Sequence, residues 1–321
     1  MRLKKEDILA GVYGLAIGDA LGVPFEFQPR EAVRQYDLTK MYGHGTHNQP
    51  VGTWSDDTSM VLATLDGMCG NSHSFGGIMD NFNRWLKQGK YTANGEVFDV
   101  GGTTFRAINR YDVGVDLSLC GEDHEYSNGN GSLMRMLPVA YYIWLRKGLK
   151  IDESTVGMIG MYSSLTHAHE ISKECCVYYV YIALYILAKS STGGLQRAIK
   201  SAIKAVESYY RERGGAMVPV ILDETSLTKS MDLREGALRS TGYVVDSLEA
   251  SLWCLYHSTD FKDAVVKAVS LGGDTDTIGA ITGSLAGLHY GWDKLPVGWV
   301  TELRNKALID TICNKFFEKY R

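Results

Sequence analysis

Glycines spaced four residues apart occur in two stretches of the chain and constrain its fold more than any other feature. They stand at Gly14, Gly18 and Gly22, and at Gly279, Gly283, Gly287 and Gly291. In a helix, residues four apart share one face, so each series forms a ridge of glycine. Glycine inside a helix costs about 1 kcal/mol relative to alanine, and close helix–helix approach is a reason to bear that cost. We therefore expect the helices at 6–22 and 276–290 to form the central pair of a helical bundle.

Helical periodicity also dominates the rest of the chain. Apolar side chains in the stretch 168–189 recur at steps of three and four, while the alternation of period two that is typical of strands is scarce. The predicted helices are 6–21, 57–68, 75–88, 103–110, 132–146, 153–164, 168–189, 194–213, 244–258, 261–271, 276–290 and 298–319, the last broken near its middle. No domain linker is evident between them. We therefore expect an all-α fold in a single domain that covers residues 1–321.

Long polar stretches separate some of these helices. They lie at 22–56, 89–102, 111–131 and 214–243, and they are rich in Gly, Asn, Asp and Thr. Loops of this length on a helical frame usually serve a function or are disordered. Because these loops hold most of the polar motifs described below, we favour function.

Composition narrows the class of protein. Charged residues make up 22% of the 321 and hydrophobic residues 45%, with a net charge of -4, which is ordinary for a soluble globular protein. The chain has no basic excess that would favour nucleic acid, and no stretch of about 18 uncharged apolar residues that would span a membrane. Glu6 and Asp7 make the N-terminus a poor signal peptide. The six cysteines show no C-x-x-C spacing, so we expect reduced thiols in a cytoplasmic protein, without a membrane or nucleic-acid partner.

Two acidic turns precede predicted helices and share one pattern. The turn at 52–58 reads GTWSDDT and the turn at 272–277 reads GGDTDT, so each offers two carboxylates and a hydroxyl. Either turn alone reads as an ordinary acidic helix cap. Together they form an oxygen-only ligand set that suits hard cations such as Mg²⁺ and Mn²⁺. A haloacid-dehalogenase phosphohydrolase is disfavoured, because its motif needs a hydroxyl residue at the position of Ile278.

Three further carboxylates stand out, although an ordinary exposed loop or turn also explains Glu26 or Asp99 when each is taken alone. The segment GDALGVPFE, at 18–26, places Asp19 near a helix C-terminus, where it opposes the dipole and so requires a specific partner. The same segment places Glu26 in an extended or turn region after a proline. Asp99 lies shortly before the predicted helix at 103–110.

Two other motifs are candidates for binding an anionic ligand. The segment SNGNGSLMR, at 127–135, is a Gly/Asn turn whose successive amides suit a phosphate, although a plain helix cap fits equally well. It lacks the lysine of a Walker A loop. His167 and His169 are two residues apart and do not share a helix face, so a zinc pair is not expected. His167 is either a substrate donor or a structural histidine.

In their order along the chain, these motifs resemble the ADP-ribosylglycohydrolases, which include the dinitrogenase reductase-activating glycohydrolases. The resemblance rests on GDALGVPFE, GTWSDDTSM, FDVGGTTFRAI, SNGNGSLMRMLPVA, TH, TGYVVDSLEASLW and GGDTDTIGAITGSLAGLHYG, and it extends from about residue 6 to about residue 291. It implies a compact, orthogonal multi-helix ADP-ribosylglycohydrolase-type domain with two Mg²⁺ or Mn²⁺ ions. The family usually has threonine where Ser55 stands.

The resemblance also implies roles for individual residues. The metal ligands would be Ser55, Asp56, Asp57, Asp274, Asp276 and Thr277. The ADP-ribose contacts would be Gly129, Asn130, Gly131, Ser132, His167, Gly242 and Tyr243. Asp99 matches the general base of bacterial members and Glu26 the glutamate implicated in other branches, so both remain candidate catalytic residues.

The implied activity is hydrolysis of the bond between ADP-ribose and a modified protein side chain, with arginine favoured, or a small molecule. In this hypothesis the distal ribose is oriented by the metal pair while Asp99 or Glu26 activates water. One alternative is a hydrolase of another nucleoside-like or small nitrogenous substrate on the same scaffold. Another is a non-catalytic ADP-ribose-binding or crystallin-like protein, which the six retained oxygen ligands disfavour. We expect a monomer in which loops 27–51 and 214–241 set the leaving-group preference.

Overall fold

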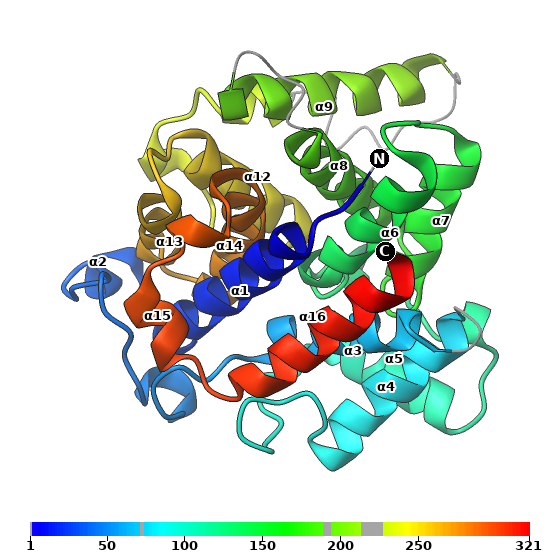
Figure 1. The fold of residues 1–321 in the computed structure, drawn as a ribbon, viewed down its shortest axis with the longest axis horizontal. Coiled ribbons are helices and arrows are strands. Elements are labelled where there is room, and N and C mark those ends of the chain that lie inside the picture. The colour runs from blue at the N-terminus through cyan, green and yellow to red at the C-terminus, as the bar shows by residue number, and fades with distance from the viewer. Residues whose placement is uncertain (1, 71–73, 189–193, 213–226) are drawn as a thin grey trace.

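The two glycine-lined helices, α1 (Lys5–Gly22) and α14 (Thr275–Tyr290), pack against each other at the centre of the computed structural model (Figure 1). A Cβ atom added to Gly18 would lie 1.9 Å from the carbonyl oxygen of Gly279, and one added to Gly279 would lie 2.4 Å from the carbonyl oxygen of Gly18. Backbone therefore meets backbone, and any side chain would hold the helices apart. The predicted central pair is confirmed.

The other helices surround this pair. The structure describes residues 2–70, 74–188, 194–212 and 227–321, and within these ranges it has no β-strand. The remaining α-helices are α2 (Arg30–Val33), α3 (Asp56–Met68), α4 (Phe75–Gln88), α5 (Gly102–Asp112), α6 (Leu137–Lys147), α7 (Glu153–Ser164), α8 (Glu170–Leu187), α9 (Gly194–Glu212), α11 (Leu227–Ser230), α12 (Val244–Tyr256), α13 (Phe261–Ser270), α15 (Val297–Glu302) and α16 (Lys306–Tyr320). The predicted all-α fold is confirmed.

Short 3₁₀ turns connect several of these helices. They are η1 (Val23–Phe25), η2 (Gly45–His47), η3 (Leu117–Leu119), η4 (Glu125–Ser127), η5 (Leu133–Arg135), η6 (Glu235–Ala237) and η7 (Trp292–Lys294). Of these, η1 lies within the motif at 18–26 and η5 within the motif at 127–135, and η4 ends at the first residue of the latter.

Each partner of the central pair has its own covering layer. α3 and α16 pack on α1, whereas α12 and α13 pack on α14. α4 covers the outer side of α3, and α5 packs on α4. α8 contacts both α12 and α14 and is itself covered by α9, which crosses the top of the view in Figure 1. Side chains of all these layers form one continuous apolar core.

The structure corrects the predicted helix at 132–146. Residues 133–135 form the 3₁₀ turn η5, and α6 begins only at Leu137. Pro138 explains the difference, because a proline lacks the N–H that a helix interior needs and is tolerated in a first turn. The predicted break in 298–319 is confirmed between α15 and α16, where Asn305 is left-handed with φ 44°. Residues 189 and 213, and the part 214–226 of the predicted loop 214–243, lie outside the described residues. The rest of that loop contains α11 and η6.

α1 has the composition of a membrane span but is buried inside the fold. The segment Lys5–Phe25 has a mean hydropathy of 1.6, and 94% of the 18-residue window that gives this value is buried. Contacts with the neighbouring helices account for its apolar character on all sides.

All six cysteines are free, and five of them are buried.

Candidate active site

The two acidic turns meet because α3 and α14 begin side by side at one end of the central pair. Oγ1 of Thr277, in the first turn of α14, donates a hydrogen bond to Oδ2 of Asp57 in the first turn of α3 (3.3 Å). The hydroxyl of Ser55 caps α3 by accepting from the N–H of Asp57. Side chains that lie 220 residues apart in the sequence therefore form one cluster.

Asp19 fixes the start of α3. Its Oδ1 accepts the N–H of Ser55 (2.8 Å), while its Oδ2 accepts both the N–H (3.0 Å) and the hydroxyl (2.6 Å) of Thr58. The carboxylate is fully buried, and burial raises its pKa to about 6 although these hydrogen bonds lower it. The prediction that Asp19, near the C-terminus of a helix, has a specific partner is confirmed, because it binds Ser55 and Thr58. Asp19 positions the candidate metal ligands that follow Ser55.

The cluster holds carboxylate oxygens that no donor satisfies. Oδ1 of Asp57, Oδ1 of Asp274 and Oδ2 of Asp276 are buried without a hydrogen-bond partner among the described residues. Ligand atoms of Asp19, Asp57 and Asp276 lie within 4.8 Å of one another, and so do those of Glu26, Asp274 and Asp276. Burying such charges without compensation is costly, and oxygen-binding cations would compensate them. The residues therefore fit a centre for hard divalent cations.

Electrostatic repulsion within the cluster is strong. Burial, followed by repulsion from neighbouring carboxylates, holds the pKa of Asp56, Asp57 and Asp276 well above its usual range. Burial also raises the pKa of Asp274, although its Oδ2 accepts a hydrogen bond from Nδ2 of Asn130 (2.6 Å). All six predicted ligand positions thus share one buried, negatively charged site.

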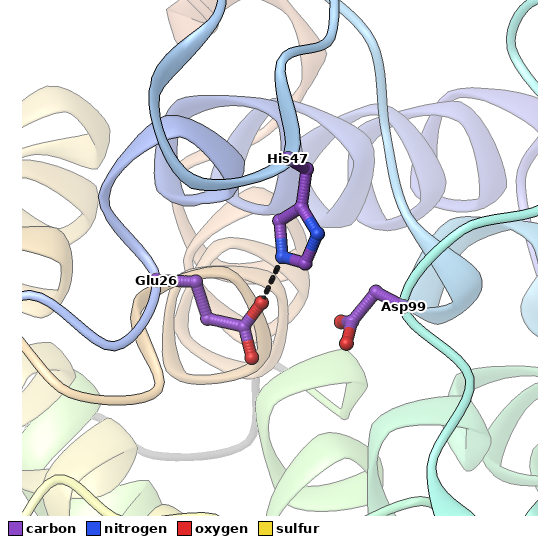
Figure 2. A group of neighbouring side chains, drawn as sticks. All are labelled: Glu26, His47 and Asp99. Carbon is purple, nitrogen blue, oxygen red and sulfur yellow. Dashed lines mark hydrogen bonds and ion pairs between the residues drawn. The ribbon is translucent and has the colours of Figure 1, made fainter.

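The two candidate catalytic carboxylates face each other at the edge of this site (Figure 2). Glu26 follows η1 at the end of α1, and burial raises its pKa to about 7. Asp99 precedes α5 and has a left-handed backbone with φ 50°. That conformation is uncommon outside glycine and tends to be retained at functional sites. Burial raises the pKa of Asp99 as well.

His47 belongs to this group but was not predicted from the sequence. Its Nε2 pairs with a carboxylate oxygen of Glu26, and only 15% of its side chain is exposed. The bond to Glu26 raises the pKa of the imidazole. The residue lies in the loop 27–51, whose shape no local sequence pattern indicates.

A cleft of about 540 Å³ opens beside the acidic cluster. Of the predicted ADP-ribose contacts, Gly129, Asn130, Gly131, His167 and Gly242 line it. It is also lined by residues that were not among those predicted contacts, including Phe27, Thr104, Ser240 and Thr241. The backbone N–H of Asn130 donates to the carbonyl of Gly242 (3.1 Å), which holds two segments of the wall together. Burial lowers the pKa of His167 to about 3, so this imidazole is neutral.

Ser132 and Tyr243 are not among the residues that line the cleft. The hydroxyl of Ser132 is buried behind the wall, where it accepts a hydrogen bond from Oγ of Ser163 (2.9 Å) and lies 3.5 Å from Sγ of Cys176. Tyr243 forms a backbone bridge with Gly129. Ser132 therefore contacts the wall of the cleft from behind, and Tyr243 contacts it through its backbone.

The sequence pattern described as ADP-ribosylglycohydrolase matches residues 2–321. The chain belongs to the ADP-ribosylglycohydrolase family. It is 30% identical to the ADP-ribosylarginine hydrolase Tri1 of Serratia proteamaculans over 95% of this chain and 77% of that protein. It is also 30% identical to the ADP-ribosyl-[dinitrogen reductase] glycohydrolase of Rhodospirillum rubrum, over 93% of this chain and 90% of that protein.

A solved structure, the "ADP-ribosylglycohydrolase-related protein complex", has the same fold. It superposes with a TM-score of 0.76 and 25% identity, and the match covers 99% of each chain. This ADP-ribosylglycohydrolase is accordingly a glycosidic-bond hydrolase, in agreement with the resemblance noted in its motifs.

Proposed function

We propose that this ADP-ribosylglycohydrolase cleaves the bond between ADP-ribose and an arginine side chain of a modified protein, with the help of two Mg²⁺ or Mn²⁺ ions. The observation that carries the proposal is the set of buried carboxylate oxygens on Asp57, Asp274 and Asp276 that have no hydrogen-bond partner in the described part of the chain. Asp274 also lines the cleft. The choice of arginine is supported by the relative from Serratia proteamaculans, which is an ADP-ribosylarginine hydrolase. The choice of a modified protein is supported by the relative from Rhodospirillum rubrum, which is an ADP-ribosyl-[dinitrogen reductase] glycohydrolase.

In this proposal, the two acidic turns hold the ions. The ligands would be Ser55, Asp56, Asp57, Asp274, Asp276 and Thr277. Bound there, the ions would polarise and orient hydroxyl groups of the substrate. Asp19 keeps the first turn of α3 in place through its bonds to Ser55 and Thr58.

The cleft would bind the rest of ADP-ribose. A Cβ atom at Gly131 would lie 2.9 Å from Cε1 of His167, so glycine leaves the turn open at this point. The N–H of Asn130 already donates to Gly242, so the remaining amides of this Gly/Asn turn would be the ones to bind an anion such as a diphosphate. The neutral ring of His167 keeps one nitrogen beside the hydroxyl of Thr166 (2.8 Å) and would bond a ribose or phosphate oxygen with the other.

Glu26 and Asp99 would carry the proton transfers. Both have a pKa above the ordinary carboxyl range because they are buried, as is common for carboxyl groups that act as general acid or base. One carboxylate would accept a proton from the attacking water, and the other, in its protonated form, would donate a proton to the leaving nitrogen as the bond from that nitrogen to the anomeric carbon breaks. We also propose a cytoplasmic location, in keeping with six free cysteines.

The proposal is tested by incubating the protein with arginine- and serine-ADP-ribosylated proteins and measuring free ADP-ribose in Mg²⁺, Mn²⁺ and EDTA. We expect release from arginine in either metal and none in EDTA. Release from serine alone would correct the linkage. No release by a protein that binds metal in calorimetry would favour another nucleoside-like or nitrogenous substrate, and the absence of metal binding as well would favour a non-catalytic binder.

Separate replacement of the two carboxylates should distinguish their roles. Asp99→Asn and Glu26→Gln each remove a carboxyl group that can accept or donate a proton while keeping the side-chain size, so each is expected to lower kcat by about 10²–10⁴-fold. Loss of the general base should be relieved by added small nucleophiles such as azide, whereas loss of the leaving-group acid should be relieved by a more acidic leaving group. If both variants turn over normally, the assignment of both residues is wrong.

A further inference from the structure

The acidic end of the cleft has a single basic side chain in contact with it among the residues that the structure describes. Seven carboxyl groups gather there, and each is at least largely buried: Asp19, Glu26, Asp56, Asp57, Asp99, Asp274 and Asp276. His47 alone among Lys, Arg and His pairs with one of them, and that partner is Glu26. The pairing therefore distinguishes Glu26 from the other six groups.

The turn that carries His47 is fastened to the segment that carries Glu26. Oγ1 of Thr46 donates a hydrogen bond to the backbone carbonyl of Glu26 (2.6 Å). Gly45 lies so close to this segment that an added Cβ would be 2.0 Å from the carbonyl oxygen of Pro24. η2 is thus held in place by the Thr46 hydroxyl and by close backbone packing at Gly45, and neither contact involves the His47 ring.

The ring itself has little freedom. It lies 5.3 Å from the ring of Phe98 and 6.2 Å from that of Phe27, measured between centroids. These aromatic residues are the sequence neighbours of Asp99 and Glu26. Figure 2 shows the imidazole directed at the Glu26 carboxylate, with Asp99 on the other side of the gap. The aromatic neighbours and the fastened turn fix the direction from which His47 approaches Glu26.

We propose that His47 is a positioning residue for Glu26. Its Nε2–H holds one carboxylate oxygen of Glu26, so that the other oxygen is presented to the cleft in one orientation. A free glutamate side chain has three rotatable bonds, and a displacement of about 1 Å at a reacting group can cost about 10²-fold in rate. The inference rests on the proposed function, because it concerns the group beside the reacting bond.

A double-mutant cycle tests whether His47 acts through Glu26. We expect His47→Ala to lower kcat for ADP-ribose release by about 10- to 10²-fold, with KM within about twofold. His47→Gln, which keeps an N–H donor, should recover most of the rate. In a Glu26→Gln background, His47→Ala should cost less than about twofold more. His44→Ala, in the same turn but exposed, is the matched control and should stay within about twofold.

A readout independent of turnover separates this inference from the proposed function. We expect the Nε2 proton of His47, which pairs with Glu26, to give a slowly exchanging NMR signal that is lost in Glu26→Ala, because alanine removes the acceptor that glutamine would retain. An unchanged signal in that variant would overturn the inference. So would a full additional loss of kcat in the double variant, or a loss in His44→Ala equal to that in His47→Ala. If the unmodified protein releases no ADP-ribose, the proposed function fails, and the NMR signal still decides the role of His47.

Discussion

Asp276→Asn is expected to lower kcat by about 10³-fold while making the metal-free protein more stable. Asp276 is fully buried, its Oδ2 has no partner among the described residues, and its ligand atom lies within 4.8 Å of those of Asp19 and Asp57. An amide nitrogen or a single neutral oxygen is a poorer ligand for a hard cation than a carboxylate. If metal binding contributes about 4 kcal/mol to the transition state, its loss lowers kcat by about 10³-fold.

In EDTA, where no metal is bound, the variant is expected to gain stability, and the reason is electrostatic. Burial and repulsion raise the pKa of Asp276 in the folded state well above its ordinary value. A raised pKa means that the folded state binds protons more tightly than the unfolded state, so stability is full below the ordinary pKa and falls as the pH rises through the folded-state pKa. At neutral pH the aspartate therefore destabilises the metal-free fold, and a neutral asparagine removes that penalty.

Thermal unfolding with and without metal tests both expectations: the loss of stabilisation by metal and the gain of stability without it. For the unmodified protein, metal at about 100 times its Kd should add about 2.7 kcal/mol to the free energy of unfolding. The Asp276→Asn variant should gain little from the same metal concentration. In EDTA the order should reverse, with the variant unfolding at the higher temperature. Asp293→Asn removes one exposed carboxylate outside the site and serves as the control. Equal metal-induced stabilisation of Asp276→Asn would show that this carboxylate is not a ligand.

The fold was largely predictable because its main determinants are local and repetitive. Apolar residues at helical spacing and the two glycine ridges sufficed to predict the central pair. The exceptions have physical reasons: Pro138 delays the start of α6, and the four-residue helix α2 is too short to leave a periodic pattern. The cluster at the starts of α3 and α14 was anticipated from the shared pattern of two acidic turns.

The finer layout of the site depends on contacts that no local pattern encodes. His47 contacts Glu26 from 21 residues away along the chain, and the loop between them has no regular period. Ser132 belongs to the same Gly/Asn motif as Gly131, yet its hydroxyl faces Ser163 and Cys176 behind the wall. Within one short motif, the direction of each side chain is set by its tertiary neighbours.

The central glycines connect the fold to the site. A Cβ atom at Gly22 would lie 2.3 Å from the backbone nitrogen of Asp276, so the end of α1 packs directly on a candidate ligand turn. Asp19 on the same helix caps α3 and so positions the other turn. The spacing between α1 and α14 therefore determines how the two turns face each other.

Gly18→Ala is accordingly expected to destabilise the protein strongly, although alanine is the better helix former. The new methyl would lie 1.9 Å from the carbonyl oxygen of Gly279, and because backbone cannot rotate away, the helices must separate. We expect a loss of about 3 kcal/mol or more in the free energy of unfolding, and failure to fold for Gly18→Leu.

The matched control is Gly157→Ala in the interior of α7, where an added Cβ meets nothing within 4 Å. That variant should gain up to about 1 kcal/mol from helix propensity. Denaturant unfolding of the two alanine variants measures the contrast directly, and calorimetry on the folded fraction of Gly18→Ala should show weakened metal binding. If both variants were equally stable, close backbone packing would not be what holds α1 against α14. If Gly18→Ala were destabilised with unchanged metal affinity, the spacing of the two helices would not control the geometry of the two acidic turns.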